Sequence, residues 1–262
     1  ARQWLTRPYH QLSVLPYPQY SVAESGADRS KLPAVGVMPD VNFPDIQRGV
    51  LDNGIEVVFA RRDAVPVVEM QMVFDAGYAA DASGKLGLAG FTANMLSEGT
   101  DKLTALEISQ RSEELGARIG TGSGLDTTSV SLSALGNNLD ASIALYSDVI
   151  RNPAFREDDL AVQKKRLLAR IQQEKAQPVG LALRTLPPLL YGDDHAYGIP
   201  FTGSGTEDSV VSISSDDMHG FQQRWLRPDN ARLFVVGATS LDEIMPLLNK
   251  HFADWQAAST GR

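Results

Sequence analysis

Apolar residues along the chain follow two periods, one typical of strands and the other typical of helices. Alternation and short apolar runs predict strands at residues 50–51, 55–60, 65–74, 118–122, 127–135 and 231–237. Asn53-Gly54 separates the first two runs, and this dipeptide is the strongest short signal of a β-hairpin. The pattern therefore predicts a sheet whose first two strands form a hairpin.

Recurrence every three to four residues predicts helices at 88–98, 104–115, 139–151, 157–176, 181–191, 214–225 and 241–252. Thr104 and Glu107 have the spacing of a capping box. Pro187 and Pro188 lack backbone donors, so the helix that contains them is expected to kink or restart there. Strand pairs followed by helix pairs indicate an α+β fold, with a mostly antiparallel sheet and helices packed on one face.

The pattern changes near both ends of the chain. Residues 1–46 contain six of the fourteen prolines and no sustained period, which predicts a Pro-rich linker or arm. Residues 47–256 are expected to form a single lobe, and residues 257–262 the start of a second linker. Linkers at both ends favour a piece of a longer protein.

Composition restricts the possible chemistry. The 262 residues include no Cys, which excludes thiolate catalysis, Cys-ligated zinc and iron–sulfur clusters. Lys and Arg total 24 against 32 Asp and Glu, and the net charge of -8 argues against nucleic acid or an anionic membrane as the main partner. No apolar run approaches the roughly 18 residues of a membrane span.

Individual motifs give no clear active site. The histidines do not have the spacing that places two ligands on one helix face; they are His10, His195, His219 and His251. His195 follows two aspartates in a predicted loop, where a solvated His is favoured over a carboxylate–His site. The Gly-rich stretches 120–124 and 203–205 lack the position and the following Lys of a phosphate loop, which favours turns or a bulged edge strand.

A longer series of segments does identify a family. Residues 51–54 read Leu-Asp-Asn-Gly, and residues 87–100 read Gly-Leu-Ala-Gly-Phe-Thr-Ala-Asn-Met-Leu-Ser-Glu-Gly-Thr. They resemble the pitrilysin family, the inverzincin metallopeptidases that include the mitochondrial processing peptidases. That family's first helix reads Gly-Leu-Ala-His-Phe-x-Glu-His-Met-x-x-x-Gly-Thr and contains the His-x-x-Glu-His zinc motif. The resemblance continues in order from residue 46 to residue 256 and includes Trp-Leu-Arg-Pro-Asp-Asn at 225–230.

The chain departs from the family at every zinc-site position. Gly90 stands in place of the first His, Ala93 in place of the general-base Glu, and Asn94 in place of the second His. Arg170 aligns with the third ligand, a Glu on another helix, and Gln163 aligns with a supporting acidic residue. A guanidinium only donates hydrogen bonds and cannot ligate a metal. Arg170 either fills the degenerate site, with a hydrogen bond to Asn94, or extends to solvent and pairs with a surface carboxylate.

The resemblance implies a clamshell of two halves, each built from two similar α+β lobes. This chain then corresponds to the first lobe of the half without zinc, an inactive pseudo-peptidase lobe that binds no cofactor of its own. Zinc is expected in a catalytic partner lobe, located in the same polypeptide or in a partner subunit. The inactive lobe would form part of a chamber wall and contact peptide substrate, and the periplasm is the expected compartment by analogy.

The resemblance also marks a peptide-binding segment. In active lobes of this family an edge strand pairs with extended peptide, and the matching residues here are Gly120, Thr121, Gly122 and Ser123. The glycines of this segment weaken the inference, because a Gly-rich strand is poorly specified in register.

Two other functions stay open. The first is a structural or binding scaffold of the same fold with no peptidase partner, and a His-x-x-Glu-His lobe encoded in the same gene or an adjacent one would argue against it. The second is an unrelated enzyme built around His195, which fails if His195→Ala leaves every measured activity intact.

Overall fold

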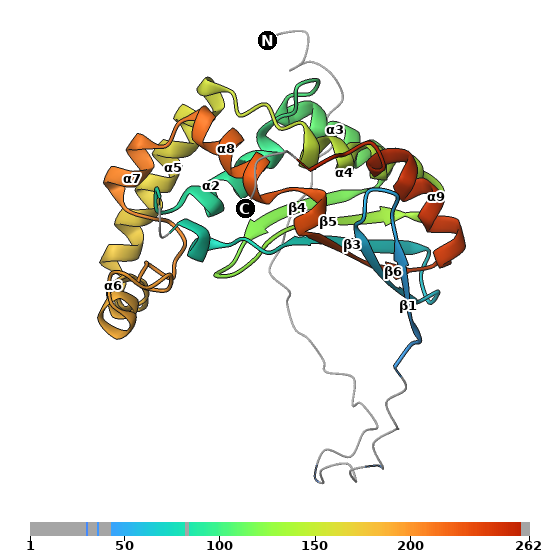
Figure 1. Ribbon diagram of the computed structural model, residues 1–262, viewed down its shortest axis with the longest axis horizontal. Coiled ribbons are helices and arrows are strands. Elements are labelled where there is room, and N and C mark those ends of the chain that lie inside the picture. The colour runs from blue at the N-terminus through green and yellow to red at the C-terminus, as the bar shows by residue number, and fades with distance from the viewer. Residues whose placement is uncertain (1–29, 31–35, 37–42, 82–83, 258–262) are drawn as a thin grey trace, which may run out of the picture. The chain divides into compact units, whose positions relative to one another are not determined.

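Residues 43–81 and 84–257, together with residues 30 and 36, are described by a computed structural model of the chain (Figure 1). The predicted arm at 1–46 therefore lies almost entirely outside the described residues, as does most of the predicted linker at 257–262. The described residues between 43 and 257 group as one compact unit.

One mixed sheet contains the six strands found in the described part of the chain. They are β1 (Ile46–Val50), β2 (Glu56–Arg61), β3 (Val67–Phe74), β4 (Arg118–Ser123), β5 (Thr128–Leu135) and β6 (Ala231–Gly237). The order across the sheet is β1-β2-β6-β3-β5-β4, so β1 and β4 are its edge strands. Strands β2 and β6 pair in parallel and all other neighbours pair antiparallel, which confirms the predicted mostly antiparallel sheet.

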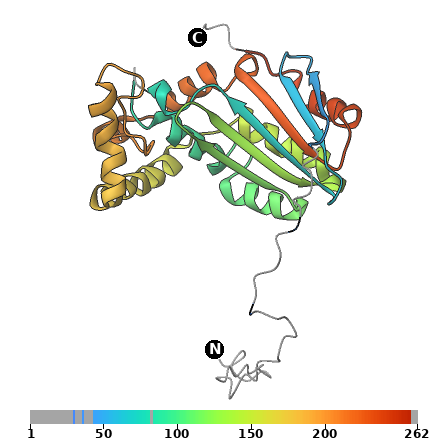
Figure 2. The same cartoon turned by 90° about the horizontal axis from the view of Figure 1, so that it is seen from below.

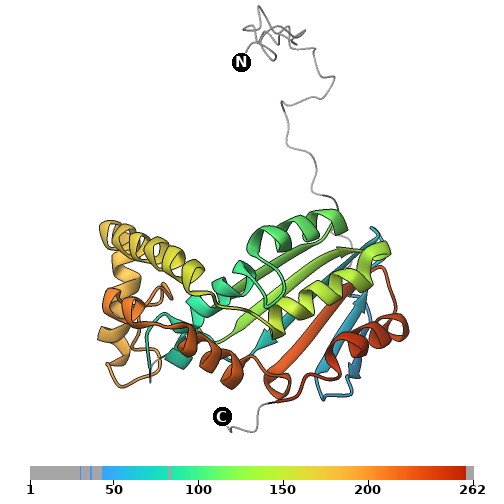
Figure 3. The same cartoon turned by 90° about the horizontal axis from the view of Figure 1, so that it is seen from above.

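The α-helices of the described residues are α2 (Leu88–Met95), α3 (Ala105–Leu115), α4 (Leu139–Arg151), α5 (Glu157–Ala176), α6 (Pro178–Tyr191), α7 (Glu207–Ser212), α8 (Ser215–Trp225) and α9 (Leu241–Phe252). Helices α3, α4 and α9 cover one face of the sheet (Figures 1 and 3), and the view from below shows the opposite face uncovered (Figure 2). Helices α5, α6 and α7 lie beyond one end of the sheet (Figure 1). None of the helices in this described part is long and apolar enough to cross a membrane.

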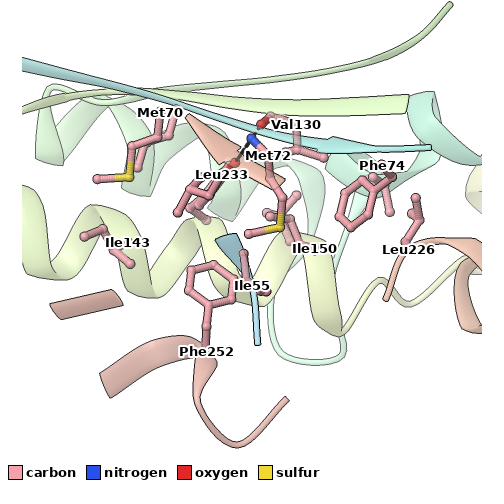
Figure 4. Packing of buried hydrophobic residues seen from close by; sticks show 14 of the residues in the cluster. Ile55, Met70, Met72, Phe74, Val130, Ile143, Ile150, Leu226, Leu233 and Phe252 are labelled. Carbon is pink, nitrogen blue, oxygen red and sulfur yellow. Dashed lines mark hydrogen bonds between the residues drawn. The ribbon is translucent and has the colours of Figure 1, made fainter. Parts of the chain in front are cut away.

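The core forms because alternate residues of each strand face the helices. In β3, Met70 and Met72 are buried, whereas the intervening Gln71 is exposed on the open face. Met70 and Met72 face Ile143 and Ile150 of helix α4 (Figure 4). The apolar surface removed from water at such positions is the main favourable contribution to folding.

Helix α6 corrects the predicted restart at Pro187 and Pro188. It continues unbroken from Pro178 to Tyr191. Pro187 has no N–H to donate to the carbonyl of Leu183, four residues earlier. That carbonyl instead accepts a hydrogen bond from the N–H of Phe201, with an N–O distance of 2.9 Å. A segment distant along the chain thus satisfies the acceptor that the proline leaves free.

Capping explains where other helices begin. The predicted capping box is present in α3, where the Thr104 hydroxyl accepts from the Glu107 N–H at 3.3 Å and Glu107 accepts from the Thr104 N–H at 2.8 Å. The short helix α7 was not predicted from the pattern. It begins with an analogous pair, Thr206 and Ser209, in which the hydroxyl of each residue accepts from the backbone N–H of the other.

Candidate functional site

A polar cavity of about 210 Å³ lies where α2, β4, α5 and residues 202–204 meet. Its lining includes three of the degenerate motif positions, Gly90, Asn94 and Arg170, and two of the predicted peptide-binding residues, Gly122 and Ser123. The remaining lining residues are Tyr78, Phe91, Leu167, Thr202, Gly203 and Ser204. Two sets of residues to which the family resemblance gave different roles thus meet at one cavity.

The other predicted site residues lie nearby but do not line this cavity. Ala93 is completely buried in α2, because it is turned by about 100° from Asn94 around the helix axis. Gln163 is half-buried on α5, two turns before Arg170. Gly120 and Thr121 are half-buried on β4, and they continue the strand beyond the cavity. The motif positions 90, 93 and 94 are therefore divided between a cavity side and a core side of α2.

Position 90 leaves little room for a larger side chain. A Cβ atom built on Gly90 would lie 3.0 Å from the carbonyl oxygen of Gly203 and 3.3 Å from Cε1 of Tyr78. Tyr78 is held in place by its hydroxyl, which donates to the carbonyl of Ser123. Tyr78 was missed by the sequence analysis, because it lies in a loop-like 3₁₀ turn, η1 (Tyr78–Asp81), without a recognisable motif.

Arg170 extends along the cavity and pairs within its own helix. Its Nε donates to Oε1 of Glu174, one turn later, at 2.9 Å, and its side chain is 57% exposed. This pairing replaces the predicted hydrogen bond to Asn94. Arg170 therefore lines the cavity and pairs with a mostly buried carboxylate of its own helix.

Glu174 also accepts a hydrogen bond from a second guanidinium, that of Arg184 in α6. Nη1 of Arg184 lies 2.9 Å from Oε2 of Glu174, and the two side chains are only 7% and 12% exposed. Burial opposes ionisation of Glu174, but hydrogen bonds from Ser204, Thr202 and the two arginines outweigh it and lower the pKa of the carboxyl.

The same arginine fixes the segment that covers Gly90. Arg184 donates from Nη1 to Oγ of Ser204 and from Nη2 to the carbonyl of Gly205, both at 2.6 Å. Gly203 adopts a φ of +68°, and a Cβ there would collide with the Tyr78 ring. No sequence pattern predicted this arrangement, because Arg184 lies in a mostly apolar helix.

Asp81 holds the start of α2. Its buried carboxylate accepts hydrogen bonds from the backbone N–H groups of Gly87 and Ala89, each at 3.0 Å. Burial raises the pKa of Asp81 to about 7, although these hydrogen bonds act in the opposite direction. Both carboxylate oxygens therefore accept hydrogen bonds from N–H groups at the start of α2, the helix that carries Gly90 and Asn94.

The cavity does not have the side chains of a zinc site. Zinc takes Cys, His, Asp or Glu ligands, whereas Gly90 has no side chain and Arg170 is a cation that only donates. Glu174 uses its oxygens to accept from two guanidiniums and Ser204. Across the described residues, no group of three or more His, Asp or Glu side chains is arranged to hold a metal ion. The available chemistry is that of a polar site with a partly exposed guanidinium.

His195 lies in a separate aromatic cluster. Its ring stacks on Tyr191 with centroids 5.3 Å apart, and its Nδ1 accepts from the N–H of Tyr197 at 3.0 Å. The Tyr197 hydroxyl donates to Asp126 at 2.7 Å. No described carboxylate hydrogen-bonds to the His195 ring, so this geometry favours an exposed loop histidine over a carboxylate–His site.

Comparison with known families gives two matches along the chain. The family described as insulinase (peptidase family M16) matches residues 56–196, and the peptidase M16 inactive domain matches residues 212–261. An uncharacterized zinc protease of Mycobacterium leprae (strain TN) is 25% identical over 205 residues, which are 78% of this chain and 45% of the relative. The mitochondrial-processing peptidase subunit beta of Rattus norvegicus is 21% identical over 236 residues, 90% of this chain and 47% of the relative. The chain spans about half the length of these curated relatives.

Solved structures share the fold. A peptidase M16 inactive domain from Pseudomonas fluorescens superposes with a TM-score of 0.76 at 26% identity, over 83% of this chain and 53% of that chain. The periplasmic protease PqqL from Escherichia coli superposes with a TM-score of 0.74 at 18% identity, over 85% of this chain and 25% of that chain. The topology described above is therefore that of M16 peptidase domains.

Proposed function

The chain belongs to the insulinase family of peptidases (M16), and on that premise we propose that it is a non-catalytic lobe of a zinc metallopeptidase. The observation that carries this proposal is the cavity beside α2. Gly90, Asn94 and Arg170 line it, and by the sequence resemblance they stand where the family has its three zinc ligands. A site that offers the Arg170 guanidinium in place of zinc ligands favours a lobe that assists proteolysis without performing it.

The proposal includes a catalytic partner. A lobe with an intact His-x-x-Glu-His motif, in the same polypeptide or in a partner subunit, would cleave peptide bonds through zinc-activated water. Support comes from the match of residues 212–261 to the inactive domain and from relatives about twice as long as the matched region. The PqqL relative is named a periplasmic protease, and we place this chain in the periplasm on the same basis.

The chain would form part of the chamber wall and contact the peptide substrate. Strand β4 is an edge strand whose partner within the described sheet is β5, so its outer edge can accept an added strand. An extended peptide on that edge would run beside Gly120, Thr121, Gly122 and Ser123. Backbone hydrogen bonds would then provide affinity with little dependence on peptide sequence.

The partner can be tested first from the gene and then by reconstitution. We expect a His-x-x-Glu-His lobe in the same gene or an adjacent one. Peptide hydrolysis by that purified lobe should rise when this chain is added, while elemental mass spectrometry finds zinc well below stoichiometric in this chain alone. A tightly bound stoichiometric zinc would overturn the non-catalytic assignment.

Two further outcomes point to the alternatives. Without any such lobe, and with no effect on a related catalytic lobe, the scaffold function becomes the better account. Loss of an activity on His195→Ala would instead revive the enzyme hypothesis around that residue.

A further inference from the structure

We propose that the cavity beside Arg170 binds a carboxylate of an extended peptide, either an acidic side chain or the peptide's C-terminus. This inference rests on the peptide-binding role proposed for β4. It assigns a ligand to the degenerate zinc position, where the family's catalytic lobes would bind a cation.

The local charge favours an anion. Glu174 is a single carboxylate placed between two guanidiniums, those of Arg170 and Arg184. The charges of these three side chains sum to one positive charge. We assign it to the more exposed Arg170, because Arg184 is buried and donates to Glu174, Ser204 and Gly205. The buried Asp81 does not line the cavity, and its oxygens accept from the α2 backbone.

Arg170 also has donors to offer. A guanidinium carries five N–H groups, and within the described residues Arg170 uses its Nε for Glu174. Arginine donors and a carboxylate form the strong class of charge-assisted hydrogen bonds, which are often bidentate. The exposed amide of Asn94 lies on the same cavity wall and can donate as well.

The hydroxyls of Tyr78 and Ser204 do not compete for this position. Tyr78 is a neutral phenol whose hydroxyl already donates to Ser123. The hydroxyl of Ser204 donates to Glu174 at 2.6 Å. Arg170 and Asn94 therefore retain donors for a ligand, whereas the hydroxyls of Tyr78 and Ser204 are already used.

The size and location suit part of a peptide. A cavity volume of about 210 Å³ is enough for one acidic side chain or a chain end. Gly122 and Ser123 belong both to the edge strand and to the cavity lining. A peptide paired with β4 would therefore pass the Arg170 guanidinium.

Isothermal titration calorimetry with three short Thr- and Val-rich peptides tests the proposal on the full 262-residue chain. The first peptide is acetylated and amidated and has one central Glu. The second has Gln in its place. The third has the same Gln and a free C-terminal carboxylate. The first and third peptides thus separate the two sources of the carboxylate.

We expect at least one carboxylate peptide to bind about tenfold more tightly than the neutral peptide, the size typical of a hydrogen bond to a charged group. Arg170→Gln should remove this difference, so that the carboxylate and neutral peptides bind the variant equally. Arg166→Gln is the matched control, because Arg166 is an exposed arginine of the same helix outside the cavity lining. It should keep the preference.

Each of three other results would contradict the proposed carboxylate site, and each would contradict a different part of the proposal. Equal binding of all three peptides overturns the carboxylate site and leaves peptide binding by β4 intact. A preference that survives Arg170→Gln places the anion site elsewhere. Failure of all three peptides to bind overturns the peptide-binding role and the pocket together.

Discussion

Arg184 and Glu174 form a buried ion pair that joins α6 to α5, with 2.9 Å between Nη1 and Oε2. Through Ser204 and Gly205, the same arginine fixes the segment that covers Gly90. The shape of the degenerate site therefore depends on a pair of residues outside the zinc motif.

Arg184→Met should destabilise the fold by about 2–4 kcal/mol, because it leaves a mostly buried carboxylate with part of its charge uncompensated. Urea unfolding followed by circular dichroism measures this loss. Arg170→Gln is the control and should cost less than about 1 kcal/mol, since Arg170 is 57% exposed and screened by water. Equal losses in the two variants would show that the buried pair has no special role.

Asp81 should make the fold less stable as the pH rises. Burial raises its pKa from 3.8 to about 7, so between these values the folded chain retains a proton that the unfolded chain has released. The stabilisation is complete below the lower pKa and is lost as the pH rises through the upper one. Relative to Asp81→Asn, the wild type should lose about 2–3 kcal/mol of unfolding free energy between pH 5 and 8.

A surface carboxylate provides the control for this pH dependence. Hydrogen bonds from Lys250 and His251 lower the pKa of the exposed Asp140, so its contribution is present at neutral pH and is lost on acidification. Asp140→Asn should therefore retain the decline between pH 5 and 8. A constant difference between wild type and Asp81→Asn over that range would contradict the assignment to Asp81.

Restoring the motif residues should not restore stoichiometric zinc. The quadruple change Gly90→His, Ala93→Glu, Asn94→His and Arg170→Glu supplies the ligands, but Gly203 and Tyr78 crowd a side chain at position 90. We expect Gly90→His alone to cost about 1–3 kcal/mol through overpacking. Zinc content and urea unfolding are the measurements.

The helical Gly220 of α8 gives a matched comparison for that change. An added Cβ at Gly220 meets nothing within 4 Å, so Gly220→His should not show the overpacking loss. A quadruple variant with full zinc and unchanged stability would refute the role given to Gly203 and Tyr78.

Gly122→Thr should stabilise the edge strand by about 0.5–1 kcal/mol, because a β-branched residue restricts the unfolded chain and suits a strand. Space permits it, since a Cβ at Gly122 meets nothing within 4 Å. At Gly120 a Cβ would lie 2.8 Å from Oγ of Ser131, so Gly120→Thr should gain less. Thermal unfolding compares the two, and a larger gain at Gly120 would contradict this account.

Local signals predicted the elements that local forces stabilise. The Asn53-Gly54 turn and the Thr104 cap are present as expected, because each acts between residues close in sequence. The family positions Gly90, Asn94 and Arg170 also meet in space as their alignment implied. The turn and the cap require no knowledge of distant contacts, whereas the meeting of residues 90, 94 and 170 was implied only by the family resemblance.

The rest depended on groups supplied from far along the chain. The continuity of α6 needs the Phe201 N–H at the Leu183 carbonyl, and the filling of position 90 needs the Tyr78 ring and the Gly203 carbonyl. Periodicity within one segment does not contain such information. The sequence therefore indicated that ligands were lost, and the structure identified what replaced them.

The place of β6 in the sheet has a consequence for biosynthesis. It lies between β2 and β3, although it is the last strand in the sequence. Until it leaves the ribosome, the β1–β2 hairpin and the β3–β5–β4 ribbon each expose a strand edge that can pair with another nascent chain. The native sheet is completed only when Ala231–Gly237 has been synthesised, so translation that terminates earlier would release fragments prone to aggregate.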